Sequence, residues 1–276
     1  MRHCDPVTLQ PIDIFTYQCY YPAVIQTIIR GICDLVYPPN CFICKNYLFT
    51  QHNSQPSPKA VLCLDCEQKI QFNIPPFCPK CSRHLRKTLK KPYCQECLMT
   101  KPHFDFAWGA CLYNEPLQQL IHAFKYGQKT LLRHFFAQQM IAFIENYELD
   151  IRQFDVIVPI PLSSTRLRER GYNQSLMLAQ GLSEQYQIPI SYNNLIRIKH
   201  TKSQTLLNQK DRWTNLVGAF RIKPLSNFFG KNILIIDDLL TTGATASMAA
   251  LALKQHGAQT VGVLTLAIVA ANDQPS

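Results

Sequence analysis

Asn-Ile-Leu-Ile-Ile-Asp-Asp-Leu-Leu-Thr-Thr-Gly-Ala-Thr, residues 232–245, is the stretch that decides the fold of this chain. Its uninterrupted apolar run at 233–236 predicts a buried strand of a parallel sheet. Small and apolar residues at helical spacing predict a helix over 244–255, which Gly257 closes. In open α/β sheets, ligands bind at the turn from a strand's carboxyl end to a helix. The stretch therefore predicts an α/β domain with a ligand site at this turn.

The polar residues of this turn define the expected ligand. Unpaired N–H groups and the positive end of the helix dipole favour an anion at a helix N-terminus. The donors expected around a phosphate come from Thr241, Thr242, Gly243, Ala244 and Thr245. Asp237 and Asp238 would repel a phosphate, so we expect them to accept hydrogen bonds from vicinal hydroxyls. The pattern predicts a ribose 5-phosphate site; the alternative is a Thr-capped acidic loop that binds nothing.

Cysteines are the second strong signal, because eight of the 12 form four Cys-x-x-Cys pairs. The pairs are Cys41 and Cys44, Cys63 and Cys66, Cys78 and Cys81, and Cys94 and Cys97. A two-residue gap places both sulfurs along one edge of a tetrahedral metal site, and two pairs complete a four-cysteine shell. We predict two structural zinc ions, one held by the first two pairs and one by the last two. An interleaved pairing, disulfides, an iron–sulfur cluster and a redox dithiol are the alternatives.

Proline-containing joints divide the 276 residues into three expected parts. These are a leader at 1–37 with an amphipathic, helix-like segment, a double zinc ribbon at 38–103, and an α/β domain at 104–271. In the last part we expect strands at 154–159, 232–236 and 260–269, and helices at 116–124, 130–145 and 173–185. The N-terminus lacks the apolar core of a signal peptide, and no apolar stretch is long enough to span a bilayer. The sequence therefore predicts a cytoplasmic protein without membrane insertion.

The formal net charge of +10 predicts a polyanionic partner. Two filled four-thiolate zinc sites, each of about −2, would leave about +6. Basic side chains gather between the third and fourth cysteine pairs, at an expected ribbon tip: Arg83, Arg86, Lys87, Lys90 and Lys91. We expect them to contact the phosphate backbone of single-stranded DNA. The alternative is a solvated loop with no nucleic-acid partner.

A third polar segment follows the strand predicted at 154–159. Arg166 and Arg170, four residues apart, would present guanidinium groups to a pyrophosphate, and Asn173 begins the next helix. The long polar segment at 197–220 suits a lid over a phosphorylated ligand. The candidate contacts of that lid are Lys202, Gln204 and Arg212. Basic loops are common, so neither segment alone is strong evidence for a ligand site. The prediction rests on their order in the chain, because both segments precede Asp237 and Asp238.

Residues 233–245 closely resemble the phosphoribosyl-pyrophosphate (PRPP) motif of type I phosphoribosyltransferases. Residues 30–269 as a whole resemble the ComF family, which joins a double zinc ribbon to a type I phosphoribosyltransferase domain. The matching features include the cysteine pairs, His-Ala-Phe-Lys-Tyr-Gly at 122–127, the loop at 161–174 and the PRPP motif. The resemblance implies a parallel sheet flanked by helices, ribose held by Asp237 and Asp238, the 5-phosphate held by residues 241–245, and magnesium with the PRPP. It does not cover the N-terminal leader.

The ComF resemblance implies a role in DNA uptake during natural transformation. We expect a competence protein that binds PRPP and single-stranded DNA, with a helicase or other competence proteins as further partners. The alternative is an active phosphoribosyltransferase, in which a nitrogen nucleophile attacks C1 of the ribose of PRPP. No acceptor pocket is visible in the sequence, and Cys4 does not lie at the exposed start that a glutamine amidotransferase needs. We therefore favour the competence role.

Overall fold

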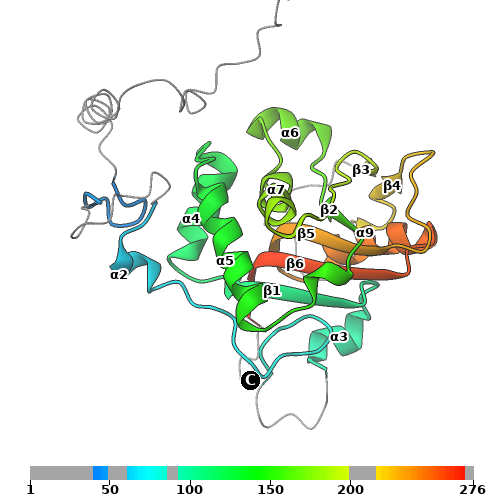
Figure 1. Cartoon of the computed structure of the whole chain (residues 1–276), viewed down its shortest axis with the longest axis horizontal. Helices are drawn as coiled ribbons and strands as arrows, with labels where there is room; N and C mark the ends of the chain where they lie inside the picture. Colours follow the sequence, from blue (N-terminus) through cyan, green and yellow to red (C-terminus); the bar gives the residue numbers. More distant parts are fainter. Residues whose placement is uncertain (1–39, 49–60, 86–92, 199–215, 271–276) are drawn as a thin grey trace, which may run out of the picture. The chain divides into compact units, whose positions relative to one another are not determined.

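The structure is a computed structural model that describes residues 40–48, 61–85, 93–198 and 216–270 (Figure 1). By its internal contacts the chain divides into a unit at Met1–Asn40 and a unit at Cys41–Ser276. The predicted leader helix lies outside the described residues. Within the described residues, no helix is both long and apolar enough to cross a membrane.

Four parallel strands form the central sheet, in the order β1-β6-β5-β2. The strands are β1 (Phe106–Leu112), β2 (Val156–Pro159), β5 (Asn232–Leu240) and β6 (Thr260–Ile268). β5 and β6 lie in the middle and are mostly buried, which explains their apolar runs, because an inner strand of a parallel sheet is covered on both faces. The register pairs Pro159 with Ile236. The segments that follow these two residues therefore start side by side.

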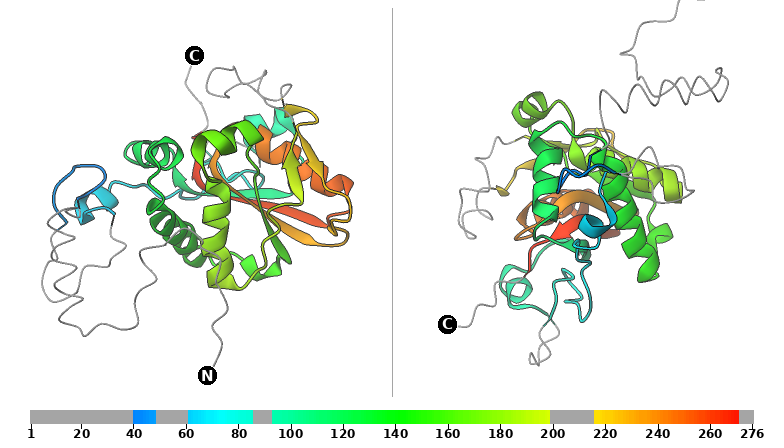
Figure 2. Two further views of the ribbon diagram at one scale, coloured as in Figure 1. Left: turned by 90° about the horizontal axis from the view of Figure 1, so that it is seen from above. Right: turned by 90° about the vertical axis from the view of Figure 1, so that its left-hand side faces the viewer.

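Helices cover both faces of the sheet (Figures 1 and 2). α4 (Leu117–Tyr126), α5 (Leu132–Asn146) and α7 (Gln174–Tyr186) lie on one face, and α9 (Ala244–Gln255) lies on the other. Successive side chains of a strand point to opposite faces. Accordingly, Leu234 and Ile236 of β5 join the core beneath the first three helices, whereas Ile233 and Ile235 join the core beneath α9. The predicted parallel sheet flanked by helices is confirmed.

The strands and helices predicted for the α/β domain are all present, with shifts of a few residues at their ends. The strand predicted at 232–236 continues to Leu240, because Asp237 and Leu239 still pair with β6. The acidic pair therefore belongs to the strand rather than to the turn after it. A small antiparallel pair, β3 (Leu195–Arg197) and β4 (Phe220–Ile222), is not predicted, because each strand has only three residues and shows no periodic pattern.

Residues just before and just after the third cysteine pair lie against β1, at the edge of the sheet. The Asn73 side-chain amide donates to the carbonyls of Ser82 and Gly109, at 2.7 and 3.1 Å. The Gly109 amide donates in turn to Ser82 Oγ at 2.8 Å, and Phe72 forms an antiparallel bridge with Cys111. These contacts cover an edge that would otherwise expose unpaired backbone groups. They also bring the second half of the ribbon region to the sheet.

Candidate functional site

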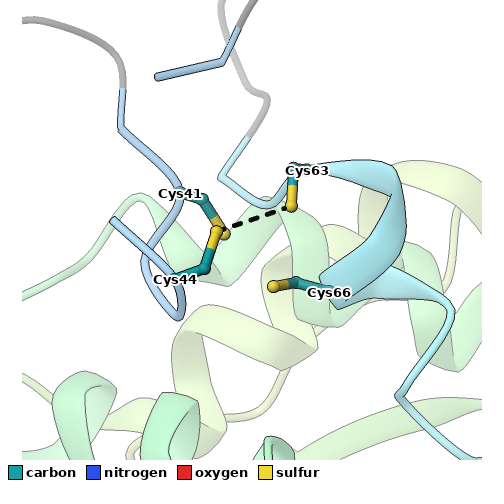
Figure 3. Close-up of side chains that lie close together, drawn as sticks. All are labelled: Cys41, Cys44, Cys63 and Cys66. Carbon is teal, nitrogen blue, oxygen red and sulfur yellow. Dashed lines mark hydrogen bonds between the residues drawn. The ribbon is translucent and has the colours of Figure 1, made fainter. Parts of the chain in front are cut away.

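The cysteine pairs of the ribbon region form two clusters of four. Figure 3 shows the first, in which the sulfurs of Cys41, Cys44, Cys63 and Cys66 point toward one another. The Sγ atoms of Cys44 and Cys63 lie 3.7 Å apart, and all sulfurs of a cluster lie within 4.8 Å of one another. A tetrahedral zinc site with Zn–S bonds of about 2.3 Å requires sulfurs about 3.8 Å apart. The first cluster therefore fits a zinc ion.

The second cluster consists of Cys78, Cys81, Cys94 and Cys97, all of them buried. Its Cys81 and Cys94 Sγ atoms lie 3.5 Å apart. In each cluster the later pair opens a short helix, because Cys63 precedes α2 (Leu64–Glu67) and Cys94 precedes α3 (Gln95–Thr100). One helical turn then returns the next cysteine to the site. The cysteines thus group as the consecutive pairs that the sequence favours, and not in the interleaved arrangement.

Arg83 does not lie on an exposed ribbon tip, which corrects its assignment as a DNA contact. It is 3% exposed, and its Nη1 atom lies 3.4 Å from Cys81 Sγ and 3.2 Å from the Glu96 carboxylate. Four thiolates around a zinc ion would carry a net negative charge, which would offset the cost of burying this cation. The other predicted DNA contacts lie outside the described residues; they are Arg86, Lys87, Lys90 and Lys91.

A pocket of about 370 Å³ opens at the carboxyl ends of β2 and β5. Its lining includes most residues predicted for the ligand: Arg166, Arg170, Asp237, Asp238, Thr241, Gly243 and Thr245. Thr242, Ala244 and Asn173 lie in the same turns but are not part of this lining. Instead, Thr242 Oγ1 accepts a hydrogen bond from the Ala244 amide at 3.4 Å, and Asn173 caps α7 by accepting one from the Ser175 amide at 3.1 Å. Their part is to shape the turns.

The turn that starts α9 has the geometry of an anion site. Gly243 precedes the helix with a φ of +78°, in the left-handed region that favours glycine. The first turn of α9 contains no acidic side chain. Its N–H groups and the nearby threonine hydroxyls therefore favour a negatively charged group, as the sequence predicts.

The acidic pair is packed beside a lysine that sequence reasoning does not assign. Asp238 is 6% exposed, and Lys125 Nζ lies 2.7 Å from its Oδ2 atom. Asp237 Oδ1 accepts hydrogen bonds from Ser175 Oγ and from the Asp238 amide, both at 2.9 Å. Burial and the charge of Asp238 raise the pKa of Asp237 to about 7, against the opposing attraction of Lys125. Burial lowers the pKa of Lys125, but the attraction of the carboxylates outweighs it and raises that pKa overall.

Cationic side chains surround the acidic pair: Lys125, Arg166, Arg170 and Arg197. Arg170 donates to Gln174 Oε1 at 2.9 Å, and its guanidinium carbon lies 4.9 Å from the centre of the Tyr126 ring. Burial and the charge of Arg166 lower the pKa of Arg197 to about 10, against the attraction of Asp237. Cations gathered in one concave site raise the local concentration of anionic ligands. The pocket thus suits an anion with several charges.

Ser175 and Arg197 are the site residues that sequence reasoning misses, whereas the family resemblance places Lys125 near the site without assigning it a role. Lys125 lies in the segment at 122–127, whose match to the ComF family is the one signal that points to it. Arg197 belongs to a strand too short to predict, and Ser175 is an ordinary residue for the first turn of a helix. The predicted lid contacts lie outside the described residues; they are Lys202, Gln204 and Arg212.

Comparison with known proteins finds the same two-part organisation. Residues 32–98 match the family described as Double zinc ribbon domain, and residues 136–276 match the family described as Phosphoribosyl transferase domain. The chain is 30% identical to Competence protein F of Haemophilus influenzae over 230 residues, which cover 82% of this chain and 96% of the relative. It is 28% identical to the DNA utilization protein YhgH of Salmonella typhimurium, over 84% of this chain and 98% of the relative. Among solved structures, the glutamine phosphoribosylpyrophosphate amidotransferase of Bacillus subtilis is similar over 48% of this chain and 25% of its own, at 21% identity and a TM-score of 0.32.

Proposed function

This chain belongs to the ComF family, and on that premise we propose that it is a competence protein for DNA uptake whose pocket binds PRPP. The family role is supported by relatives named for competence and for DNA utilization, which match more than four fifths of the chain. The match to the Phosphoribosyl transferase domain supports the ligand class. The acidic and basic side chains that line the pocket support PRPP as the particular ligand.

One observation carries the ligand assignment: an acidic pair, a helix N-terminus and a group of cations share one pocket. The N–H groups and threonine hydroxyls at the start of α9 suit the 5-phosphate. Asp237 and Asp238 suit the two ribose hydroxyls, because hydrogen bonds to carboxylates are strong. Arg166 and Arg170 suit the pyrophosphate, whose magnesium ion would offset its remaining charge. A lone phosphate would not need the acids, and a sugar without phosphate would not need the cations.

Calorimetric titration of the zinc-loaded protein with magnesium and PRPP tests this assignment. We expect the wild type to bind and the double variant Asp237→Asn, Asp238→Asn to bind at least about 100-fold more weakly, because each lost charged hydrogen bond costs about 1.5–3 kcal/mol. Asp150→Asn is the matched control, since Asp150 is exposed and is not part of the pocket lining. An unchanged affinity in the double variant, or no binding by the wild type, would refute the PRPP site.

We infer single-stranded DNA as a second ligand. The net charge of +10 and the basic run at 86–91 support a polyanionic partner. The names of the relatives support DNA as that partner. The acidic pair argues against DNA in the PRPP pocket, because deoxyribose has no second vicinal hydroxyl to offer it. We therefore expect DNA and PRPP to bind at different places and not to compete in an equilibrium binding assay.

An active phosphoribosyltransferase remains the second candidate, and the acidic pair favours it. A carboxyl group with a pKa of about 7, such as that of Asp237, is suited to general base catalysis near neutral pH. The discriminating assay measures pyrophosphate release from PRPP with ammonia, amines and nucleobases as acceptors. Release that depends on an acceptor would favour the enzyme. Tight PRPP binding with no pyrophosphate release above the rate without protein would favour a binding role.

A further inference from the structure

Arg83 is a buried cation that touches both the second cysteine cluster and the turn that begins the anion site. Its Nη1 atom lies 3.4 Å from Cys81 Sγ and 3.2 Å from the Glu96 carboxylate. Its Nη2 atom donates to the carbonyl of Thr241, and its Nε atom donates to the carbonyl of Val269 at 3.3 Å. One planar guanidinium therefore spans the metal centre and the backbone that follows β5 and β6.

The charge of the metal centre explains why this cation is buried. A charge in a protein interior is costly unless it is paired and its hydrogen bonds are satisfied. Glu96 supplies one carboxylate, with a side chain that is 16% exposed. The four thiolates of the second cluster with a zinc ion would add about −2. A filled metal site thus supplies most of the negative charge that holds Arg83 in place.

The bond to Thr241 fixes a peptide plane of the turn. In a trans peptide the carbonyl of one residue and the N–H of the next point in opposite directions. While Arg83 holds the Thr241 carbonyl on the side of the ribbon, the Thr242 amide must face away from it. This peptide stands at the start of the segment proposed to hold the 5-phosphate, so its orientation bears on ligand binding.

Two further contacts join the same ribbon region to the start of α9. The His103 amide donates to Ser247 Oγ in the first turn of the helix, at 3.0 Å. The ring of Phe104 lies beside Gly243, 3.7 Å from where a Cβ atom would stand, and Lys80 Nζ lies 5.7 Å from the centre of that ring. The metal-held ribbon therefore contacts the anion turn at more than one point. Arg83 is the charged side chain of this set that donates directly to the backbone of the turn.

We propose that Arg83 is a positioning residue that couples metal occupancy of the second cysteine cluster to the shape of the turn at 241–245. The identity of the ligand in this coupling rests on the proposed function, whereas the coupling itself concerns only the ribbon and the turn. Coupling between two sites is reciprocal. A ligand held by the turn must therefore raise the affinity of the second cluster for its metal.

Hydrogen exchange of the full-length, zinc-loaded protein tests the coupling without PRPP. Arg83→Lys keeps the charge but lacks the planar fork that reaches two carbonyls, a thiolate and a carboxylate together. We expect this variant to keep both zinc ions by metal analysis, while amides at 241–247 exchange at least tenfold faster than in the wild type. Arg168→Lys is the matched control, because Arg168 is exposed on α6 (Ser164–Arg170) and is not part of the pocket lining. Unchanged exchange at 241–247 with full zinc would overturn the coupling.

A second variant keeps the test decisive if Arg83→Lys does not fold. Glu96→Gln removes the carboxylate partner of Arg83 with little change of shape, so we expect faster exchange at 241–247 by a smaller factor. No acceleration in a folded, zinc-loaded Glu96→Gln protein would then overturn the proposal. Equilibrium competition for zinc between the wild type and a chelator, with and without PRPP, supplies the reciprocal measurement, and equal zinc affinities in a protein that binds PRPP contradict the coupling. Failure of PRPP to bind by calorimetry refutes the proposed function alone.

Discussion

Asp237→Asn should make the protein more stable near pH 8, although it removes a residue of the proposed ligand site. Burial and the neighbouring carboxylate raise the pKa of Asp237 from 3.8 to about 7, so its ionised form destabilises the folded chain. A shift of about three units corresponds to about 4 kcal/mol. The side chain also lines the pocket, where water reaches it, so we expect about half of that, on the order of 2 kcal/mol. Asparagine keeps the shape and the acceptor oxygen without the charge.

The pH dependence has a definite sign. The folded protein binds the Asp237 proton more tightly than the unfolded chain does, so this residue lowers wild-type stability as the pH rises from about 4 through about 7. The variant does not titrate at this position. Its advantage should therefore be largest above pH 7, shrink as the pH falls and vanish below about pH 4.

Urea unfolding of the zinc-loaded proteins measures this effect. The free energies of unfolding of the wild type, Asp237→Asn and the control Asp150→Asn are compared at pH values on both sides of 7. The control should match the wild type throughout, because Asp150 is exposed. The reasoning fails if Asp237→Asn is less stable than the wild type near pH 8, or if its advantage does not change with pH. A gain in stability with a loss of PRPP affinity is the pattern expected of a residue kept for function.

Three further predictions concern other contacts. Lys125→Met leaves the buried Asp238 carboxylate without its ion-pair partner, so we expect a loss of about 3 kcal/mol in urea unfolding near pH 8; an unchanged free energy of unfolding would contradict the ion pair as a source of stability. Gly262→Ala places a Cβ atom 2.7 Å from the Phe154 ring, so the melting temperature should fall by the equivalent of about 1–3 kcal/mol, and an unchanged melting temperature would show that the ring moves freely. Neutralising the basic run should weaken binding of single-stranded DNA and flatten the dependence of the binding constant on salt concentration. An unchanged salt dependence would show that the run does not contact DNA. The residues to change are Arg86, Lys87, Lys90 and Lys91.

Features that depend on neighbours in the sequence could be predicted. The apolar run at 233–236 predicts an inner strand of a parallel sheet, because only such a strand is covered on both faces. The spacing of the cysteines predicts two four-sulfur sites, because the gap within a pair sets the separation of its sulfurs. The turn at 241–245 predicts an anion site, because a helix N-terminus leaves N–H groups free. The structure confirms the strand and the two cysteine clusters, and it places most of the predicted turn residues in the pocket.

Features that depend on charge in a buried setting could not be predicted in this way. Arg83 stands in a basic run that resembles a solvated loop, yet the structure buries it against a cysteine cluster and the carbonyl of Thr241. Lys125 and Asp238 are far apart in the chain, and only the packing of α4 beside the end of β5 makes them an ion pair. Whether a charged side chain meets water, a metal centre or an opposite charge is set by its three-dimensional surroundings, and no local pattern records them. The sequence by itself therefore determined the fold and indicated the chemistry of the pocket, while the tertiary structure alone decided which cations line the pocket and which lie against the second cysteine cluster.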